Sequence, residues 1–347
     1  MANGKMKAAV LHAFKTPLSV EEIDIPTPGS GEVLVKVMAS GLCLSDVHIQ
    51  DGVLKTVKPP YIPGHEMAGI VWELGEGVKD RGLKVGQHVL CGIDIVCGKC
   101  ALCRMGRENL CVNRVRVGFE RDGSHAEYAV VPYENLHVVP DSLPFEQAAI
   151  IPDAVACMYH AVKDIGQAQP GDRALIYGVG ALGLQGVQIA KHFGCEVYAC
   201  ARTPEKLEMA RKFGADAVIN SRTQSLAAEI GRLTGGEMCD VIYDLVGNAG
   251  TIDELLPLIR PGGKIVALSY AADAFSINCQ ELVIKEKEVL GIRGSTSQNL
   301  KEALELVVEG KITPYVSARY RLDQINDALQ ALRESRSLGR SVIVFDS

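Results

Sequence analysis

A glycine-rich turn between a strand pattern and a helix pattern constrains the fold of this chain most strongly. An apolar run over Ala174–Tyr177 leads into glycines at positions 178, 180 and 183, and a helical pattern follows to Phe193. In such a turn the first glycine allows a tight bend, the second lets backbone approach a pyrophosphate, and the third lets the helix pack closely on the strand. The helix N-terminus adds free N–H groups and a positive dipole end. The pattern predicts a dinucleotide site at Gly178, Gly180, Ala181, Leu182 and Gly183.

The segments on either side of this turn differ in their periodicity. After it, strand and helix patterns alternate, as in Glu196–Ala201 and Pro204–Phe213, which is typical of βαβ units in a doubly wound parallel sheet. Before it, roughly the first 150 residues contain short strands broken by Gly and Pro, such as Glu32–Met38 and His88–Cys91, which favours a compact barrel. The predicted fold class is α/β, with a barrel-like β domain and a doubly wound Rossmann domain.

Composition excludes several classes of protein. The chain has 347 residues and a formal net charge of −6, without a cluster of basic residues, so we expect no nucleic-acid partner. No segment approaches the roughly 20 apolar residues that a membrane span needs, and the N-terminal residues lack the apolar core of a secretory signal. We therefore expect no membrane partner and a cytoplasmic location.

The end of the second strand of the Rossmann pattern bears on the choice of nucleotide. An acidic residue about 20 positions beyond the glycines normally binds the ribose 2′-hydroxyl of NAD. Ala201 stands there, followed by Arg202, with Lys206 close by. A guanidinium can grip a 2′-phosphate, whereas a carboxylate would repel it. The pattern favours NADP(H), and a surface arginine beside bound NAD remains the alternative.

Four cysteines within fifteen residues form a second motif, at positions Cys97, Cys100, Cys103 and Cys111. Four thiolates at such spacing can close a tetrahedral zinc site. Two disulfides would not suit a reducing compartment, and the fourth cysteine lacks the proline that follows it in one type of iron–sulfur motif. A closed site of this kind has no open position for a substrate, so we expect a structural zinc.

Ligand-type side chains also occur in three short segments far apart in the chain. The segment 43–48 holds Cys43, Ser45, Asp46 and His48; the second holds His65 and Glu66; the third holds Asp153. Their spacing alone does not join them into one site. The other histidines have no partners that the sequence reveals, and we expect structural or surface roles for them: His12, His88, His125, His137, His160 and His192.

Several of these motifs together resemble the zinc-containing medium-chain alcohol dehydrogenases. The segment beginning Gly64-His65-Glu66, with Gly69, Gly75 and Val78 at the family's spacing, resembles the family signature. The cysteine quartet, the glycine-rich turn and the C-terminal Leu338-Gly339-Arg340 match in order and spacing. The resemblance covers essentially the whole chain. It implies a catalytic, zinc-binding (GroES-like) domain at residues 1–153 and 290–347 and a Rossmann domain at 154–289.

The resemblance also implies roles for the scattered residues. Cys43, His65 and Asp153 resemble the catalytic zinc ligands, aspartate being the third ligand in the microbial secondary-alcohol branch. Glu66 resembles a carboxylate that can enter the metal shell, and Asp46 resembles the group that orients His65. Ser45 and His48 resemble a proton relay, and Arg340 resembles an arginine that pairs with the cofactor pyrophosphate.

The expected protein is a zinc-dependent oxidoreductase with two Zn²⁺ per chain, as the family resemblance implies. It would transfer hydride between NADP(H) and a small alcohol, ketone or aldehyde, as a homodimer or homotetramer. The main alternative is an NAD-dependent dehydrogenase of a polyol, an amino alcohol or an acyl-CoA-linked hydroxy compound on the same scaffold. An alternative of a different class is a non-catalytic binding or structural member of the family.

Overall fold

The described part of the chain folds into two compact units. The computed structural model describes residues 4–248, 250–269 and 274–346. Unit 1 comprises Met1–Ala154, Thr296–Val308 and Pro314–Ser347, and unit 2 comprises Val155–Ser295 and Glu309–Thr313. The domain boundary that the family resemblance implies, between residues 289 and 290, lies within the strand Glu288–Gly291.

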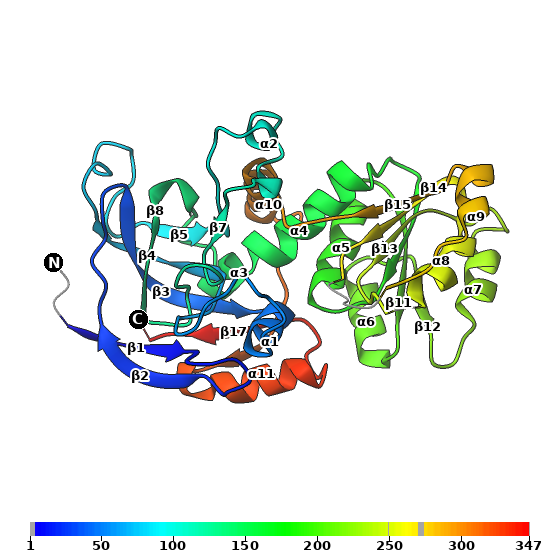
Figure 1. Ribbon diagram of the computed structural model, residues 1–347. Coiled ribbons are helices and arrows are strands. Elements are labelled where there is room, and N and C mark those ends of the chain that lie inside the picture. Colours follow the sequence, from blue (N-terminus) through cyan, green and yellow to red (C-terminus); the bar gives the residue numbers. More distant parts are fainter. Residues whose placement is uncertain (1–3, 249, 270–273, 347) are drawn as a thin grey trace. The chain divides into compact units, whose positions relative to one another are not determined.

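Unit 1 is built on a seven-stranded sheet in the order β16-β17-β3-β4-β5-β9, with β8 paired to β3. Figure 1 labels β3, β4, β5, β8 and β17 of this sheet. An antiparallel pair, β1 with β2, and a short pair, β6 with β7, complete its strands among the described residues. The strands are β1 (Lys5–Val10), β2 (Ser19–Asp24), β3 (Glu32–Leu42), β4 (Glu66–Leu74), β5 (His88–Cys91), β6 (Asp94–Ile95), β7 (Val115–Arg116), β8 (Tyr128–Pro132), β9 (Leu136–Val138), β16 (Val316–Tyr320) and β17 (Arg340–Val344). The helices are α1 (Leu44–Gln50), α2 (Ala101–Arg104), α3 (Phe145–Ala149), α10 (Ser297–Val308) and α11 (Ile325–Arg333).

The core of unit 1 explains why its helices hold their positions. Val33, Val35 and Val37 alternate along β3 and pack in one buried cluster, as the period of two in a strand requires. In a second cluster, Ile49 of α1 packs with Ile325 of α11 and neighbouring apolar side chains. Both isoleucines are completely buried. This packing fixes α1, which carries several of the candidate functional residues.

Unit 2 is a doubly wound sheet of six parallel strands in the order β12-β11-β10-β13-β14-β15. Its strands are β10 (Arg173–Tyr177), β11 (Glu196–Ala201), β12 (Ala217–Asn220), β13 (Cys239–Asp244), β14 (Ile259–Ala267) and β15 (Glu288–Gly291). Its helices are α4 (Ala156–His160), α5 (Ala181–His192), α6 (Pro204–Lys212), α7 (Leu226–Leu233), α8 (Thr251–Leu255) and α9 (Cys279–Lys285). The order matches the Rossmann arrangement, so the predicted fold class is confirmed.

Successive residues of β10 face opposite sides of this sheet. Leu175 belongs to a buried cluster that includes Ile230 of α7 and Ile252 of α8. Ile176 faces the other side, where a Cβ built on Gly186 of α5 would lie 3.4 Å from its Cδ1. Both faces are therefore covered by helices, which is why β10 is an unbroken apolar run.

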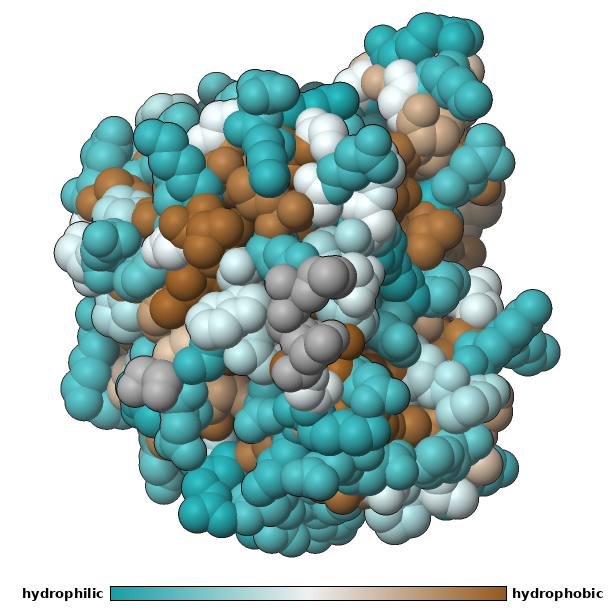
Figure 2. Space-filling view, turned by 90° about the vertical axis from the view of Figure 1, so that its left-hand side faces the viewer, coloured by the Kyte–Doolittle hydropathy of each residue, from teal (hydrophilic) through white to brown (hydrophobic). Residues whose placement is uncertain are grey.

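The surface carries hydrophobic side chains among hydrophilic ones. Figure 2 shows one face that is mainly hydrophilic, with a hydrophobic area in its upper half. Within residues 4–248, 250–269 and 274–346, no helix combines the length and the apolar character that crossing a membrane requires.

Candidate active site

Three ligand-type side chains that are far apart in the sequence meet in unit 1. Cys43 is the N-cap of α1, His65 immediately precedes β4, and Asp153 lies in a π-helical segment, Ile151–Val155. One ligand atom from each lies within 4.8 Å of the others. Short π-helical segments often occur at functional sites. The donors are a thiol, an imidazole and a carboxylate, which suit a zinc ion with an open fourth position.

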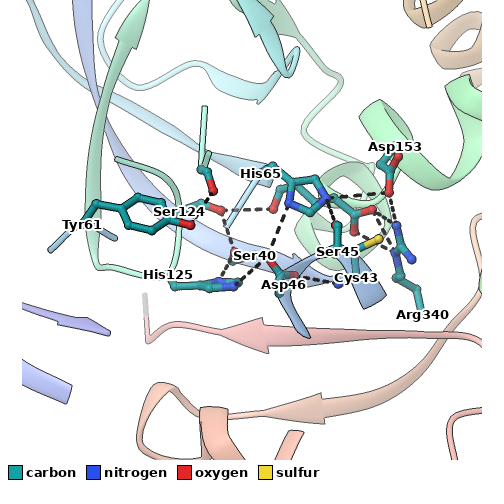
Figure 3. A network of polar contacts seen from close by, with 12 residues as sticks. Ser40, Cys43, Ser45, Asp46, Tyr61, His65, Ser124, His125, Asp153 and Arg340 are labelled. Carbon is teal, nitrogen blue, oxygen red and sulfur yellow. Dashed lines mark hydrogen bonds and ion pairs between the residues drawn. The ribbon is translucent and has the colours of Figure 1, made fainter. Parts of the chain in front are cut away.

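Asp46 defines which nitrogen of His65 faces the ligand cluster (Figure 3). Its Oδ1 lies 3.5 Å from His65 Nδ1, and its Oδ2 accepts a 2.8 Å hydrogen bond from the backbone N–H of Cys43. The other ring nitrogen, Nε2, lies 3.8 Å from Asp153 Oδ2 and 3.3 Å from Ser45 Oγ. Nε2 is therefore the atom of His65 that is available to a metal.

Arg340 lies against two carboxylates of unit 1. Its Nε is 2.9 and 3.0 Å from the two carboxylate oxygens of Glu66, and its Nη2 contacts both Glu66 and Asp153. The residue is only 3 % exposed. The Glu66 carboxylate has room beside Arg340 because Gly41 has no side chain: a Cβ on Gly41 would lie 1.8 Å from Glu66 Oε2. The contact of Arg340 with the cofactor pyrophosphate stays a prediction.

The electrostatics of the cluster favour a cation. Burial disfavours the charged form of Asp153, but His65 and Arg340 outweigh burial and lower its pKa. Burial likewise disfavours a protonated His65, but Asp46 and Asp153 outweigh it and raise the pKa of the imidazole. Burial raises the pKa of Glu66, while Arg340 opposes that shift. Positive charge at His65 is thus favoured by its surroundings.

The two residues expected to move a proton share a face of α1. Ser45 and His48 are three positions apart on this helix, which places their side chains on neighbouring turns. Ser45 Oγ reaches the ligand cluster through its contact with His65. Partial burial lowers the pKa of His48, while Asp51 raises it and Arg333 lowers it further. His48 is therefore biased toward the neutral form, which can accept a proton.

The cysteine quartet forms a second candidate metal centre in unit 1. The sulphur atoms of Cys97, Cys100, Cys103 and Cys111 lie within 4.8 Å of one another, and three of the pairs are 3.5 to 4.0 Å apart. A tetrahedral zinc with Zn–S bonds of about 2.3 Å implies S–S distances of about 3.8 Å. The backbone N–H groups of Lys99 and Cys100 lower the pKa of Cys97 to about 6. The geometry therefore fits a tetrahedral, thiolate-ligated ion.

The glycine-rich turn of unit 2 has the geometry its sequence predicts. Gly178 adopts φ +105°, which disfavours side chains, and a Cβ on Gly183 would lie 2.3 Å from the carbonyl oxygen of Gly178. Gly180, the N-cap of α5, faces open space. Ala181 and Leu182 form the first turn of that helix. The free N–H groups there can donate hydrogen bonds to a pyrophosphate.

Cationic side chains follow β11. Ala201 is buried at the end of this strand, Arg202 is exposed beyond it, and Lys206 lies one turn into α6. Burial lowers the pKa of Lys206, and the nearby charge of Arg202 lowers it further. The buried hydroxyl of Thr203 has no hydrogen-bond partner. This arrangement fits an anion such as a 2′-phosphate.

The structure also reveals polar residues that sequence reasoning missed. Ser40, Ser124 and His125 are completely buried and form a hydrogen-bonded chain that leads to Asp46 (Figure 3). His125 was expected to have only a structural or surface role. Its partner Ser40 lies 85 positions away, so no local spacing could have indicated the contact.

Two family descriptions match the chain over its two units. "Alcohol dehydrogenase GroES-like domain" matches residues 29–141, and "Zinc-binding dehydrogenase" matches residues 181–309. The chain belongs to the zinc-containing medium-chain alcohol dehydrogenase family, as the sequence motifs predicted. It is an alcohol dehydrogenase-type oxidoreductase, which excludes the non-catalytic alternative.

Individual relatives align with this chain over nearly their full lengths. An alcohol dehydrogenase from Geobacillus stearothermophilus is 36 % identical over 344 residues, which cover 98 % of this chain and 100 % of the relative. An L-threonine 3-dehydrogenase from Pyrococcus horikoshii is 35 % identical, covering 91 % and 92 %.

The similar solved structures include one in complex with NAD and one bound to NADP. Acetophenone reductase from Geotrichum candidum, in complex with NAD, has a TM-score of 0.90 at 30 % identity, covering 99 % of this chain and 98 % of its own. A dehydrogenase from Sinorhizobium meliloti, described as zinc-binding and bound to NADP, has a TM-score of 0.91 at 30 % identity, covering 99 % and 100 %. The family therefore does not by itself decide between NAD and NADP.

Proposed function

We propose that this chain is a zinc-dependent alcohol dehydrogenase or carbonyl reductase that transfers hydride between NADP(H) and a small alcohol, ketone or aldehyde. The observation that carries this proposal is the meeting of Cys43, His65 and Asp153, whose ligand atoms lie within 4.8 Å of one another. Three protein ligands leave the fourth position of a tetrahedral zinc open for a substrate oxygen.

The chemistry at this site divides between the metal and the protein. Bound zinc would serve as a Lewis acid toward the oxygen of the alcohol or carbonyl. Asp46 holds His65 with Nδ1 turned away from the ligand cluster, so that Nε2 can bind. Arg340 neutralises part of the charge of Glu66 and Asp153, which keeps two carboxylates compatible in a buried space.

Proton transfer is assigned to side chains of α1. Ser45 Oγ lies beside the ligand cluster and is placed to exchange a proton with a substrate hydroxyl. His48, partly buried on the same face of the helix, is the proposed group that exchanges this proton with solvent. Its lowered pKa favours the neutral imidazole that is needed when an alcohol is oxidised.

The nucleotide site supports the choice of NADP(H). Gly178, Gly180 and Gly183 shape the turn for the pyrophosphate, together with Ala181 and Leu182. At the end of β11, Ala201 leaves room where a carboxylate would repel a phosphate, and Arg202 and Lys206 supply positive charge. Arg340 is the proposed further contact of the pyrophosphate, although its present partners are carboxylates.

A second candidate is an NAD-dependent dehydrogenase of an amino alcohol, a polyol or an acyl-CoA-linked hydroxy compound. The 35 % identity to an L-threonine 3-dehydrogenase favours this candidate, because it covers most of both chains. A relative described as an acryloyl-coenzyme A reductase, 28 % identical, is named for a coenzyme A thioester, which supports including thioesters in the substrate panel.

The assembly and metal content complete the proposal. We assign the catalytic, zinc-binding role to residues 1–153 and 290–347 and nucleotide binding to residues 154–289. Each chain is proposed to hold two Zn²⁺, one at Cys43, His65 and Asp153, with Glu66 adjacent, and one at the cysteine quartet. The proposed assembly is a cytoplasmic homodimer or homotetramer that engages no nucleic acid and no membrane.

Initial rates across one substrate panel test the function. NADPH and NADH are each assayed with small ketones and aldehydes, and NADP and NAD with the matching alcohols, L-threonine, polyols and hydroxyacyl-CoA thioesters. Turnover of simple ketones with strong preference for NADPH supports the first candidate. Preference for NADH together with oxidation of L-threonine supports the second candidate and overturns the first.

Substitution of a proposed ligand tests the mechanism. Cys43→Ser is expected to bind one zinc fewer per chain and to lose nearly all turnover, because the open metal position depends on all three ligands. It should still bind NADPH, since the glycine-rich turn belongs to unit 2, which has its own core. Full activity in Cys43→Ser, or in metal-free wild type, would contradict the proposed mechanism.

A further inference from the structure

A buried chain of polar groups ends at the carboxylate that orients a proposed zinc ligand. Ser124 Oγ lies 2.6 Å from Ser40 Oγ, and Ser40 Oγ lies 2.9 Å from His125 Nδ1. The far side of the His125 ring, Nε2, lies 3.8 Å from Asp46 Oδ1. Figure 3 shows the Asp46 carboxylate between the rings of His125 and His65.

Three buried atoms of this polar network have no hydrogen-bond partner, and two of them, both ring nitrogens, lie near the third, a carboxylate oxygen. They are Asp46 Oδ1, His65 Nδ1 and His125 Nε2. Their separations, 3.5 and 3.8 Å, exceed the usual hydrogen-bond limit of about 3.2 Å by less than 1 Å. An unpaired polar atom in the interior is costly, so a small adjustment that pairs all three is favoured.

The partners determine which ring nitrogen carries the proton. An ionised carboxylate only accepts hydrogen bonds, so His125 must donate from Nε2 to Asp46. Nδ1 of a neutral His125 is then an acceptor, and Ser40 donates to it. His65 donates from Nδ1 to the same carboxylate oxygen, which leaves its Nε2 unprotonated for a metal. With a metal ion bound at His65 Nε2, each donor of this polar network would have an acceptor.

The backbone holds His125 rigidly at this place. Its N–H donates to the carbonyl of Pro63 at 3.0 Å, and its carbonyl accepts from Ala9 N–H at 2.8 Å. Gly64 lies against it: a Cβ there would be 2.7 Å from both the backbone N and the Nδ1 of His125. The segment that precedes His65 is thus packed directly on His125.

We propose that His125 is a positioning residue of the catalytic metal centre, which holds Asp46 by donating from Nε2 and so fixes the orientation and tautomer of His65. The proposal rests on the proposed function, because it assumes a zinc ion at Cys43, His65 and Asp153. Asp46 already has one anchor, the N–H of Cys43 on Oδ2; His125 supplies the anchor on the other oxygen.

Zinc retention in variants of the full-length holoenzyme tests the proposal. His125→Phe keeps a ring but removes the donor, and zinc retention against a chelator, followed by native mass spectrometry, should weaken about tenfold at one of the two sites. His125→Gln places an amide donor near the position of Nε2 and should retain zinc nearly as wild type does. His125→Asn has a shorter amide that reaches Ser40 but not Asp46, and should behave like His125→Phe.

A second readout reports on the geometry of the site. In protein loaded with Co²⁺, the visible absorption bands of the cysteine–histidine–carboxylate site should shift in His125→Phe and His125→Asn but not in His125→Gln. The control is His137→Phe, which changes the same residue type on β9, where His137 pairs with Leu90. It should leave both zinc retention and the spectrum unchanged.

The outcomes separate the two proposals. Equal zinc retention in His125→Phe and wild type would overturn the role of His125. If His125→Phe does not fold, equal retention in His125→Gln and His125→Asn overturns it instead. If Cys43→Ser binds as much zinc as wild type, the proposed catalytic centre has failed, and the role of His125 with it.

Discussion

Among single residues, those at the end of β11 bear most directly on which nucleotide the protein binds. Ala201 is buried and uncharged, whereas Arg202 and Lys206 place two cations close enough for one to lower the pKa of the other. Two positive charges held close together repel each other, and a bound anion would relieve this repulsion. The side chains at this strand end are therefore expected to decide which nucleotide binds.

Arg202→Ala should lower kcat/KM with NADPH by about tenfold to hundredfold and leave kcat/KM with NADH nearly unchanged. Such a loss corresponds to a charge-assisted hydrogen bond of about 1.5–3 kcal/mol. Steady-state kinetics with both nucleotides measure it. Arg211→Ala, which removes an exposed arginine further along α6, is the matched control. Equal losses with NADPH and NADH would rule out a 2′-phosphate contact.

Residue types in compact motifs could be predicted, but residue pairs that meet across the fold could not. The glycines of the turn and the four cysteines lie within six and fifteen positions, so local spacing is informative. Arg340 and Glu66 are 274 positions apart, and only the fold brings them together. The ligands Cys43, His65 and Asp153 were grouped only through the family resemblance, because spacing did not join them.

At the scale of elements, the turn after β7 supports a proposed zinc ligand. Phe119 is buried, and its ring centroid lies 4.9 Å from that of His65. The guanidinium of Arg116 lies over the Phe119 ring, 4.0 Å from its centroid, and forms a bidentate ion pair with Glu120. Burial disfavours the Glu120 carboxylate, but Arg116 and Thr56 outweigh it and lower its pKa to about 2.

Glu120→Gln should destabilise the protein by about 1 kcal/mol at pH 7. The pKa of Glu120 is lower in the folded chain, so its stabilisation is present above pH 4.5 and is lost as the pH falls toward 2. Urea unfolding of wild type and variant between pH 7 and 3 should give converging free energies. Glu22→Gln, on the exposed side of β2, is the control and should track wild type. A difference that persists unchanged to pH 3 would contradict the ion pair.

We propose that a metal ion contributes more than packing to the order of the segment 97–111. Its helix α2 is four residues long and buries no side chain, so a bound ion would supply most of its order. Cys103→Ser should remove one zinc per chain, lower the melting temperature by several degrees and expose this segment to proteolysis. Cys279→Ser, which alters an exposed cysteine on α9, is the control. An unchanged zinc count in Cys103→Ser would contradict a zinc ion at the quartet.

At the scale of the whole molecule, unit 2 leaves apolar surface uncovered. Val283 and Ile284 of α9 are each 70 % exposed. Among the described strands, β15 pairs with β14 on one side only, so it is an edge of the sheet. Exposed edges and apolar patches are typical of contacts between subunits. This face is the proposed contact between copies of the chain.

The double variant Val283→Asp, Ile284→Asp should shift the mass in solution from dimer or tetramer toward monomer. Two buried carboxylates in an interface would lack partners and oppose association. Sedimentation velocity of wild type and variant measures the mass. Val85→Asp, which alters another exposed valine on unit 1, should not change it. A monomeric wild type would contradict the proposed oligomer.

The architecture was largely predictable because its patterns are periodic. The strands His88–Cys91 and Glu196–Ala201 have the bounds that the sequence indicated, since each is flanked by clear breaks. The N-terminal pair β1 and β2 was not predicted: β2 is mostly polar and partly exposed, so it lacks an apolar period. Strand β15 continues the Rossmann sheet to Gly291, so the domain division proposed from the family resemblance passes through a strand.

The order of the chain has a consequence for biosynthesis. Unit 2 is nearly continuous, from Val155 to Ser295, and can fold as soon as that stretch has left the ribosome. Unit 1 cannot close its sheet until β17 is inserted between β16 and β3. Arg340 is the first residue of that strand. During translation, the carboxylates of Glu66 and Asp153 therefore lack their guanidinium partner until residue 340 has been made.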